Sequence, residues 1–143
     1  MEMADVNVLL YAHRTESARH EEYREWLEAR VGASEPFGVS ELVLAAVIRI
    51  STNHRAFADP APPATAVQFC EDLLSAPSTV PIRAGPRHWP IFADLCRTVG
   101  ARANVVPDAY LAALAIEHGA TWLTADTGFG RFPGLRWRHP LDG

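Results

Sequence analysis

Short apolar runs alternate with longer amphipathic stretches along the chain. The first run, residues 4–11, is rich in β-branched and aliphatic residues and predicts a buried strand that continues into a loop. Four more strands are predicted, at residues 36–39, 79–82, 120–124 and 135–138. Apolar residues occupy most positions of these runs, without the strict alternation of a half-exposed sheet. This pattern is typical of strands that are covered on both faces.

The stretches between these runs have the periodicity of helices. Helices are predicted at residues 18–31, 41–51, from Thr65 onward, at 87–99 and at 108–118. Ser40 and Thr65 are the expected N-caps of the second and third helices, and Pro107 suits a first helical position. Three helices are expected to end at a glycine: Gly32, Gly100 and Gly119. The helix at 41–51 is apolar on nearly every face, so we expect it to be buried.

Strands that alternate with helices predict an α/β fold, with a central, mostly parallel sheet covered by helices. The chain has 143 residues, of which 48% are hydrophobic and 21% charged, as expected for one compact domain with a proper core. No repeat, low-complexity tract or long linker divides it. We therefore expect a single domain over residues 1–143.

The bulk properties exclude several classes of protein. No apolar run is long enough to span a membrane, and Asp5 interrupts the first apolar stretch, which speaks against a signal peptide and favours the cytoplasm. Cys70 and Cys96 lie in helical patterns and are expected to be buried thiols. The sequence contains no zinc-binding His or Cys spacing, P-loop, GxSxG or GxGxxG motif. The net charge of −4 gives no general attraction to nucleic acids.

Four carboxylates stand out because they lie at a strand end or a helix start. Asp5 interrupts an apolar strand, Glu41 begins the apolar helix, Asp108 begins the Ala-rich helix, and Asp126 follows the strand at 120–124. The ligand site of an α/β sheet gathers at such positions. Carboxylates brought together without basic partners repel one another, and a hard divalent cation relieves that repulsion. Their oxygen ligands predict Mg²⁺ or Mn²⁺ and the hydrolysis of a phosphodiester.

Each of these acids also has a simpler interpretation. Glu41 and Asp108 could be first-turn acids that a helix dipole favours, and Asp126 could belong to a turn with Gly128. Asp5 is the hardest to explain in this way, because an acid within a buried strand needs a partner. The hypothesis therefore rests on the set and not on any one member.

The order of these residues resembles the PIN-domain family. Asp5-Val6-Asn7 resembles its first-strand signature, Val106-Pro107-Asp108 and the small residues after it resemble the helix that carries its third acid, and Thr124-Ala125-Asp126 with Phe129 resembles its closing motif. The resemblance extends from Asp5 to Pro140, and the central segment is similar to VapC-type toxins of actinobacteria. It implies a three-layer α/β/α domain and a Mg²⁺- or Mn²⁺-dependent endoribonuclease that cleaves structured RNA such as tRNA or rRNA. It also implies a VapB-type antitoxin as partner and a homodimer.

The resemblance also assigns roles to individual residues. Asp5, Asp108 and Asp126 are expected to bind the metal, and Glu41 to complete the catalytic set. Asn7 and Thr124 are expected to hold the carboxylates by hydrogen bonds, although Thr124 could equally be an ordinary strand residue. The family's second acid usually lies near the position of Ala45 and Ala46 here, one turn beyond Glu41, and Gly128 stands where many members have another Asp.

Three further points concern RNA binding and the alternatives. Arg14, Arg49, Arg55 and Arg131 are candidates to line an RNA groove, although Arg49 could instead form an internal ion pair. A PIN-like domain that has lost its metal site would only bind a protein or an RNA. Asp126-Thr127-Gly128 also matches the motif of aspartic proteases, but these would require a symmetric dimer of mostly β chains.

Overall fold

Five parallel strands form the centre of the computed structural model, which describes residues 1–142. Their order across the sheet is β3-β2-β1-β4-β5. The strands are β1 (Glu2–Ala4), β2 (Phe37–Val39), β3 (Thr79–Pro81), β4 (Thr121–Leu123) and β5 (Trp137–Arg138). Met3, Phe37 and Trp122 on the three central strands are each at most 1% exposed, so the middle of the sheet is core on both faces.

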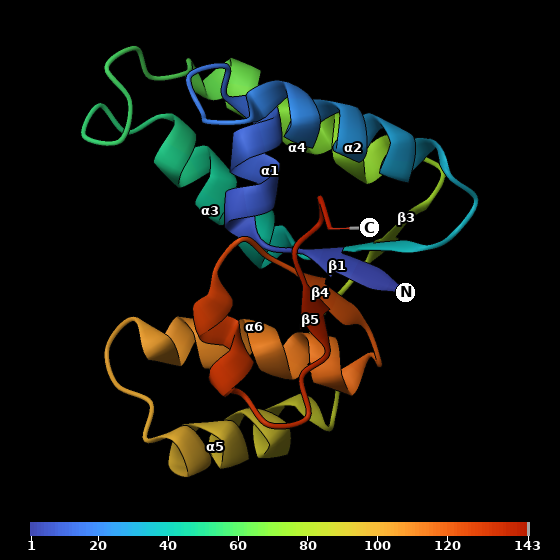
Figure 1. Ribbon diagram of the computed structural model, residues 1–143, viewed down its shortest axis with the longest axis vertical. Coiled ribbons are helices and arrows are strands. Elements are labelled where there is room, and N and C mark those ends of the chain that lie inside the picture. The colour runs from blue at the N-terminus through green and yellow to red at the C-terminus, as the bar shows by residue number, and fades with distance from the viewer. Residues whose placement is uncertain (143) are drawn as a thin grey trace.

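Helices cover both faces of this sheet (Figure 1). On one side lie α1 (Val6–His13), α2 (His20–Gly32), α3 (Glu41–Ser51) and α4 (Pro63–Ser75). On the other side lie α5 (His88–Val99) and α6 (Val105–Glu117), and a 3₁₀ turn, η1 (Thr127–Arg131), follows β4. The predicted three-layer α/β/α fold with a parallel sheet is therefore confirmed. Within residues 1–142, no helix has the length and apolar character needed to cross a membrane.

The prediction of a strand over residues 4–11 is wrong. Strand β1 ends at Ala4, and the β-branched residues that follow form helix α1. Asp5 is the N-cap of this helix, and its Oδ1 accepts a hydrogen bond from the backbone N of Val6 at 2.6 Å. Val8 and Leu9 are fully buried in the core, so tertiary packing overrides their preference for strands.

Other boundaries agree more closely with the sequence. Helix α3 covers the predicted residues, and the Ser40 hydroxyl accepts from the backbone N of Leu42 as the expected cap. Helix α5 ends at Gly100, whose φ of 64° lies in the left-handed region. The prediction that Thr65 caps the third helix is wrong. Helix α4 begins at Pro63, because the fixed φ of proline suits the first helical position, and Thr65 lies within the first turn. Helix α6 begins at Val105, two residues before Pro107.

The strand order creates a crevice beside β1. From β1 the chain moves outward to β2 and β3, and it then returns to add β4 and β5 on the opposite side. The connections therefore leave β1 and β4 in opposite directions, which opens the sheet at their carboxyl ends. Asp5 directly follows β1 and Asp126 lies close after β4, so both carboxylates are placed at this crevice.

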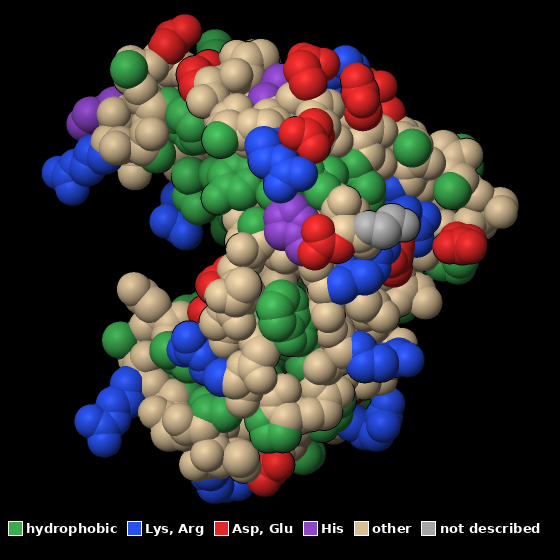
Figure 2. Space-filling view, viewed as in Figure 1, with side chains coloured by type: hydrophobic (Ala, Val, Ile, Leu, Met, Phe, Trp, Pro, Cys, Tyr) green, Lys and Arg blue, Asp and Glu red, His purple; other side chains and the backbone are tan. Residues whose placement is uncertain are grey.

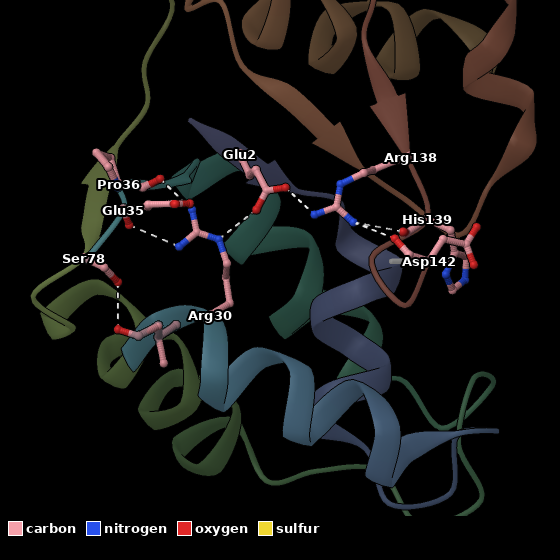
Figure 3. A network of polar contacts seen from close by, with 9 residues as sticks. Glu2, Arg30, Glu35, Pro36, Ser78, Arg138, His139 and Asp142 are labelled. Atoms are coloured by element: carbon pink, nitrogen blue, oxygen red, sulfur yellow. Dashed lines mark hydrogen bonds and ion pairs between the residues drawn. The ribbon is translucent and has the colours of Figure 1, made fainter. Parts of the chain in front are cut away.

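The amino end of β1 is held by an ion-pair network (Figure 3). Glu2 pairs with Arg30 of α2, whose Nε lies 2.9 Å from Glu2 Oε1, and with Arg138 of β5. The Arg30 guanidinium, which is 8% exposed, also donates to the carbonyl oxygens of Glu35 and Pro36. Although burial raises the pKa of Glu2, the hydrogen bonds and charges of Arg138 and Arg30 hold it below its ordinary value.

Candidate functional site

A cleft of about 690 Å³ opens at the carboxyl ends of β1 and β4. Helices α1 and α3 form one wall, and α5, α6 and η1 form the other. The walls are mainly apolar, and the residues that form them are Leu42, Ala45, Ala46, Ile50, Phe92, Val106, Tyr110, Leu111 and Phe129. Figure 2 shows the molecule hollowed between the two helical layers, with arginine side chains on both rims of the hollow.

Asp5, Asp108 and Asp126 all line this cleft. Asp5 comes from the turn between β1 and α1, Asp108 from the first turn of α6, and Asp126 from the turn that opens η1. Among residues 1–142, none of the three carboxylates forms an ion pair with an arginine or histidine. Three segments that are far apart in the chain thus bring three unneutralised acids to one cleft.

Asp5 is only 5% exposed, and hydrogen bonds hold its carboxylate in place. Its Oδ2 accepts from the hydroxyl of Thr124 at 2.6 Å and from the side-chain amide of Asn7 at 3.2 Å. Burial raises the pKa of Asp5 to about 6, and the negative charges of Asp108 and Asp126 add to this effect, although the hydrogen bonds from Thr124 and Val6 oppose it. The protein therefore keeps an acid where its ionised form is disfavoured.

Thr124 and Asn7 connect the elements that carry the acids. The Thr124 hydroxyl, which is fully buried, donates to Asp5 and accepts from the backbone N of Asp126 at 3.0 Å. The Asn7 amide oxygen accepts from the backbone N of Ala125 at 3.2 Å. Both side chains thus contact a carboxylate and join the start of α1 to the segment after β4. Asn7 does so from the first turn of α1 and not from a strand as predicted.

Asp108 and Asp126 are more accessible than Asp5. Burial and the nearby charge of Asp126 raise the pKa of Asp108, while Arg131 acts in the opposite direction. Oδ1 of Asp126 accepts from the backbone N of Gly128 at 2.8 Å, which is the turn that the sequence offered as the simpler interpretation of this acid. The turn interpretation is confirmed, and Asp126 nevertheless lines the cleft, so the turn is compatible with the predicted role in metal binding.

The residues at this site fit a hard divalent cation by their chemistry. Their acids supply carboxylate oxygens, Asp108 and Asp126 raise the pKa of Asp5, and Asp126 raises that of Asp108. Among residues 1–142, no basic side chain forms an ion pair with them. Within the described chain, no three His, Cys, Asp or Glu side chains already stand close enough together to hold one ion. Metal binding would therefore require Asp108 and Asp126, the two accessible acids, to turn toward Asp5.

Glu41 does not join these acids. Its side chain is 64% exposed and faces Arg83, whose Nη2 lies 3.5 Å from Glu41 Oε2. It borders a separate, shallow pocket with Ser40 and Ile82. Ala45 and Ala46, one turn further along α3, line the cleft instead. The prediction that Glu41 completes the catalytic set therefore receives no support from its position.

The apolar walls of the cleft were not predicted from the sequence. Helix α3 is apolar on nearly every face, which predicted burial, yet Leu42 is 53% exposed because this face borders the cleft. The same pattern is expected of a helix with one face in the core and another lining an open cavity. Arg49 also lines the cleft and forms no ion pair within residues 1–142, so the alternative of an internal pair is wrong.

The other two arginine candidates on this side of the molecule differ from Arg49. Arg55 is exposed, in the turns that follow α3. Arg14 is buried and paired with Glu16 at 2.9 Å, and it donates to the carbonyl of Asp59 and lies over the ring of Phe57. Arg14 thus holds the loops together and is not available to a ligand.

Two curated relatives match this chain almost from end to end. Ribonuclease VapC43 of Mycobacterium tuberculosis is 50% identical over 139 residues, which cover 97% of this chain and 95% of that protein. Ribonuclease VapC25 of the same species is 39% identical over 140 residues, covering 98% and 99%. These identities are high enough to establish a common family.

Solved structures share the fold at lower identity. VapBC2 from Rickettsia felis, bound to a DNA fragment from its promoter, superposes with a TM-score of 0.69 at 20% identity, covering 96% of this chain and 97% of that one. VapC20 of Mycobacterium tuberculosis, described as a sarcin-ricin loop cleaving toxin, gives 0.65 at 16% identity, covering 95% and 99%. A parallel sheet of this kind is not the mostly β dimer that an aspartic protease would need, so Asp126-Thr127-Gly128 is not a protease motif here. The PIN domain matches residues 3–135, and this chain belongs to that family, among the VapC ribonucleases.

Proposed function

We propose that this chain is the toxin of a type II toxin–antitoxin pair, a Mg²⁺- or Mn²⁺-dependent endoribonuclease. The observation that carries the proposal is that Asp5, Asp108 and Asp126 line one cleft at the switch point of the sheet and have no ion-pair partner among residues 1–142. Membership of the VapC ribonucleases supports the same activity.

The three aspartates would hold the divalent ion, which supplies a Lewis acid for the scissile phosphate and lowers the pKa of an attacking water. Asp5 is the fixed member of the set, because Thr124 and Asn7 orient its carboxylate. Asp108 of α6 and Asp126 at the start of η1 would turn toward Asp5 to complete the set. Asp126 is the most exposed of the three, and in this proposal it would accept the proton of a water that approaches from the open side.

RNA is the proposed substrate, and structured RNA such as tRNA or rRNA is the proposed class. The cationic side chains Arg49 in the cleft and Arg55 beyond α3 are available to backbone phosphates. The VapC20 toxin, which shares the fold, is described as cleaving the sarcin-ricin loop. Apolar walls around an acidic centre suit unpaired bases better than a closed duplex.

A VapB-type antitoxin is the proposed protein partner, and a homodimer the proposed assembly. Several structures with this fold are VapBC complexes, including those from Rickettsia felis and Salmonella typhimurium. The exposed apolar wall of α3 would be covered in such a complex, because a stable protein interface places apolar side chains at its centre.

The proposal is tested by RNA cleavage with matched acid variants. Asp5→Asn and Asp108→Asn are each expected to lower the cleavage rate at least about 100-fold, because each removes a charge that the metal requires. Asp94→Asn, an exposed acid of α5 outside the cleft, serves as the control and should keep full activity. EDTA should abolish cleavage, and Mg²⁺ or Mn²⁺ should restore it.

Two results would contradict this proposal. Cleavage that persists in EDTA would exclude a metal-dependent mechanism. A wild-type protein that folds normally, shows no heat of Mg²⁺ or Mn²⁺ binding in calorimetry and cleaves no RNA would favour the alternative of a decayed PIN-like domain that only binds its partner.

A further inference from the structure

Arg131 is held close to the acids by the turn that follows β4. Its Nε donates to the carbonyl oxygen of Gly128 at 2.7 Å, so the guanidinium folds back over η1. A Cβ atom on Gly128 would stand 2.7 Å from Nη2 of Arg131 and 2.9 Å from Oδ1 of Asp126. Glycine at position 128 therefore leaves the space in which the arginine and the aspartate lie next to each other.

This arginine approaches the acids without neutralising them. The positive charge of Arg131 acts to lower the pKa of Asp108, yet within residues 1–142 Arg131 forms no ion pair. Nε is its one hydrogen-bonding atom with a partner among the described residues, and both Nη atoms remain free to donate. Because the side chain is exposed, those donors face solvent beside the cleft.

We propose that Arg131 forms a phosphate-binding site that holds the RNA phosphodiester against the three aspartates, and that Gly128 positions it. The inference rests on the proposed function. Three carboxylates repel an approaching phosphate, so the site needs a cation that does not itself bind the carboxylates. A guanidinium with both Nη atoms free offers paired donors to phosphate oxygens, and its anchored Nε reduces the entropy lost on binding.

The competing explanation is that Arg131 only offsets the charge of the acids within the folded protein. The two explanations differ in RNA binding. A phosphate contact releases counterions, so losing it lowers the affinity and makes that affinity less dependent on salt, whereas an internal counterion affects stability alone. Gly128→Ala places a methyl group against both Arg131 Nη2 and Asp126 Oδ1, so it disturbs their arrangement without removing a functional group, and the φ of Gly128 is not in the left-handed region.

The experiment measures fluorescence anisotropy of a short fluorescein-labelled single-stranded RNA of mixed sequence, in EDTA and over a series of salt concentrations. Arg131→Ala is expected to weaken binding about 10-fold and to reduce the slope of log K against log salt by about 0.7. Arg131→Lys should recover part of the affinity, and Gly128→Ala should lose part of it. Single-turnover cleavage in Mn²⁺ should slow in the same order.

Two controls match these variants. Arg97→Ala removes an exposed arginine of α5 that has no ion pair among the described residues, and Gly32→Ala adds a methyl group with no atom within 4 Å. Both should bind and cleave like the wild type. Wild-type affinity, salt slope and cleavage rate in Arg131→Ala would overturn the inference and leave the proposed function standing. A wild-type protein that cleaves no RNA with Mg²⁺ or Mn²⁺ would overturn the proposed function first.

Discussion

Asp5 is a single residue whose ionised form is unfavourable where the fold places it. It caps α1, accepts hydrogen bonds from Thr124 and Asn7, and is 5% exposed. Despite these favourable contacts, burial and two neighbouring aspartates raise its pKa to about 6 from the ordinary 3.8. An ionised carboxylate here destabilises the metal-free protein, and a bound cation would remove that cost.

The stability of the metal-free protein is therefore expected to depend on pH through Asp5. A raised pKa means that the folded protein binds the proton more tightly, so this stabilising contribution is complete below about pH 3.8 and is lost as the pH rises past 6. The full loss amounts to roughly 3 kcal/mol. Urea denaturation in EDTA should show wild type losing stability relative to Asp5→Asn between pH 4 and 7.

Saturating Mg²⁺ at pH 7 should restore most of that difference to the wild type and leave Asp5→Asn unchanged. A difference between the two proteins that stays constant across this pH range would show that Asp5 is ionised without cost, and the argument for a cation at this position would fail.

At the scale of elements, the sequence predicted helix α3 to the residue and misjudged its surroundings. Ser40 and the apolar run after it locate the helix through local chemistry. Whether an apolar helix faces a core or a cavity depends on elements from elsewhere in the chain, here α5 and α6. The position of those elements cannot be inferred from the sequence of α3. The strand prediction for residues 4–11 is wrong for the same reason, because tertiary contacts and not local propensities make α1 helical.

The position of α3 also leads to a prediction for Glu41. This side chain faces Arg83 at the exposed start of the helix, one turn before Ala45 and Ala46, which line the cleft, and it does not line the cleft itself. Glu41→Gln should therefore cost less than about 1 kcal/mol, from the helix dipole and an exposed ion pair, and should keep the RNA cleavage rate within about 2-fold. A loss comparable to that of Asp108→Asn would show that Glu41 reaches the metal in the active protein.

The three acids of the candidate site could be predicted from the sequence, and so could the hydrogen bonds that Asn7 and Thr124 donate to Asp5, although Thr124 could equally have been an ordinary strand residue. Asp5, Asp108 and Asp126 follow from their places at strand ends and helix starts, which parallel α/β topology brings together. The arrangement of Gly128 and Arg131 could not be predicted, since it depends on a side chain folding back over a 3₁₀ turn. Thr124 appeared optional in the sequence, yet it contacts both Asp5 and Asp126.

At the scale of the molecule, the carboxylates at the two ends of β1 have opposite electrostatic surroundings. Glu2 at the amino end is surrounded by Arg30 and Arg138, which join α2, β1 and β5, and its pKa is lowered (Figure 3). Asp5 beyond the carboxyl end forms no ion pair among residues 1–142, and its pKa is raised. The first end stabilises the sheet, and the second leaves an unbalanced charge at the cleft.

The two carboxylates should therefore respond to neutralisation with opposite signs. Glu2→Gln leaves the buried Arg30 without its charge partner, so the variant should lose about 2 kcal/mol of unfolding free energy at pH 7. Because the pKa of Glu2 is lowered, its contribution to stability is present above pH 4.5 and disappears as the pH falls, and the difference from wild type should shrink toward pH 3.

Glu21→Gln, which loses an exposed ion pair with Arg24, is the control and should keep the wild-type Tm. Equal Tm values for Glu2→Gln and wild type at pH 7 would mean that the network does not hold the sheet together, and that Arg30 is satisfied by the carbonyls of Glu35 and Pro36 alone.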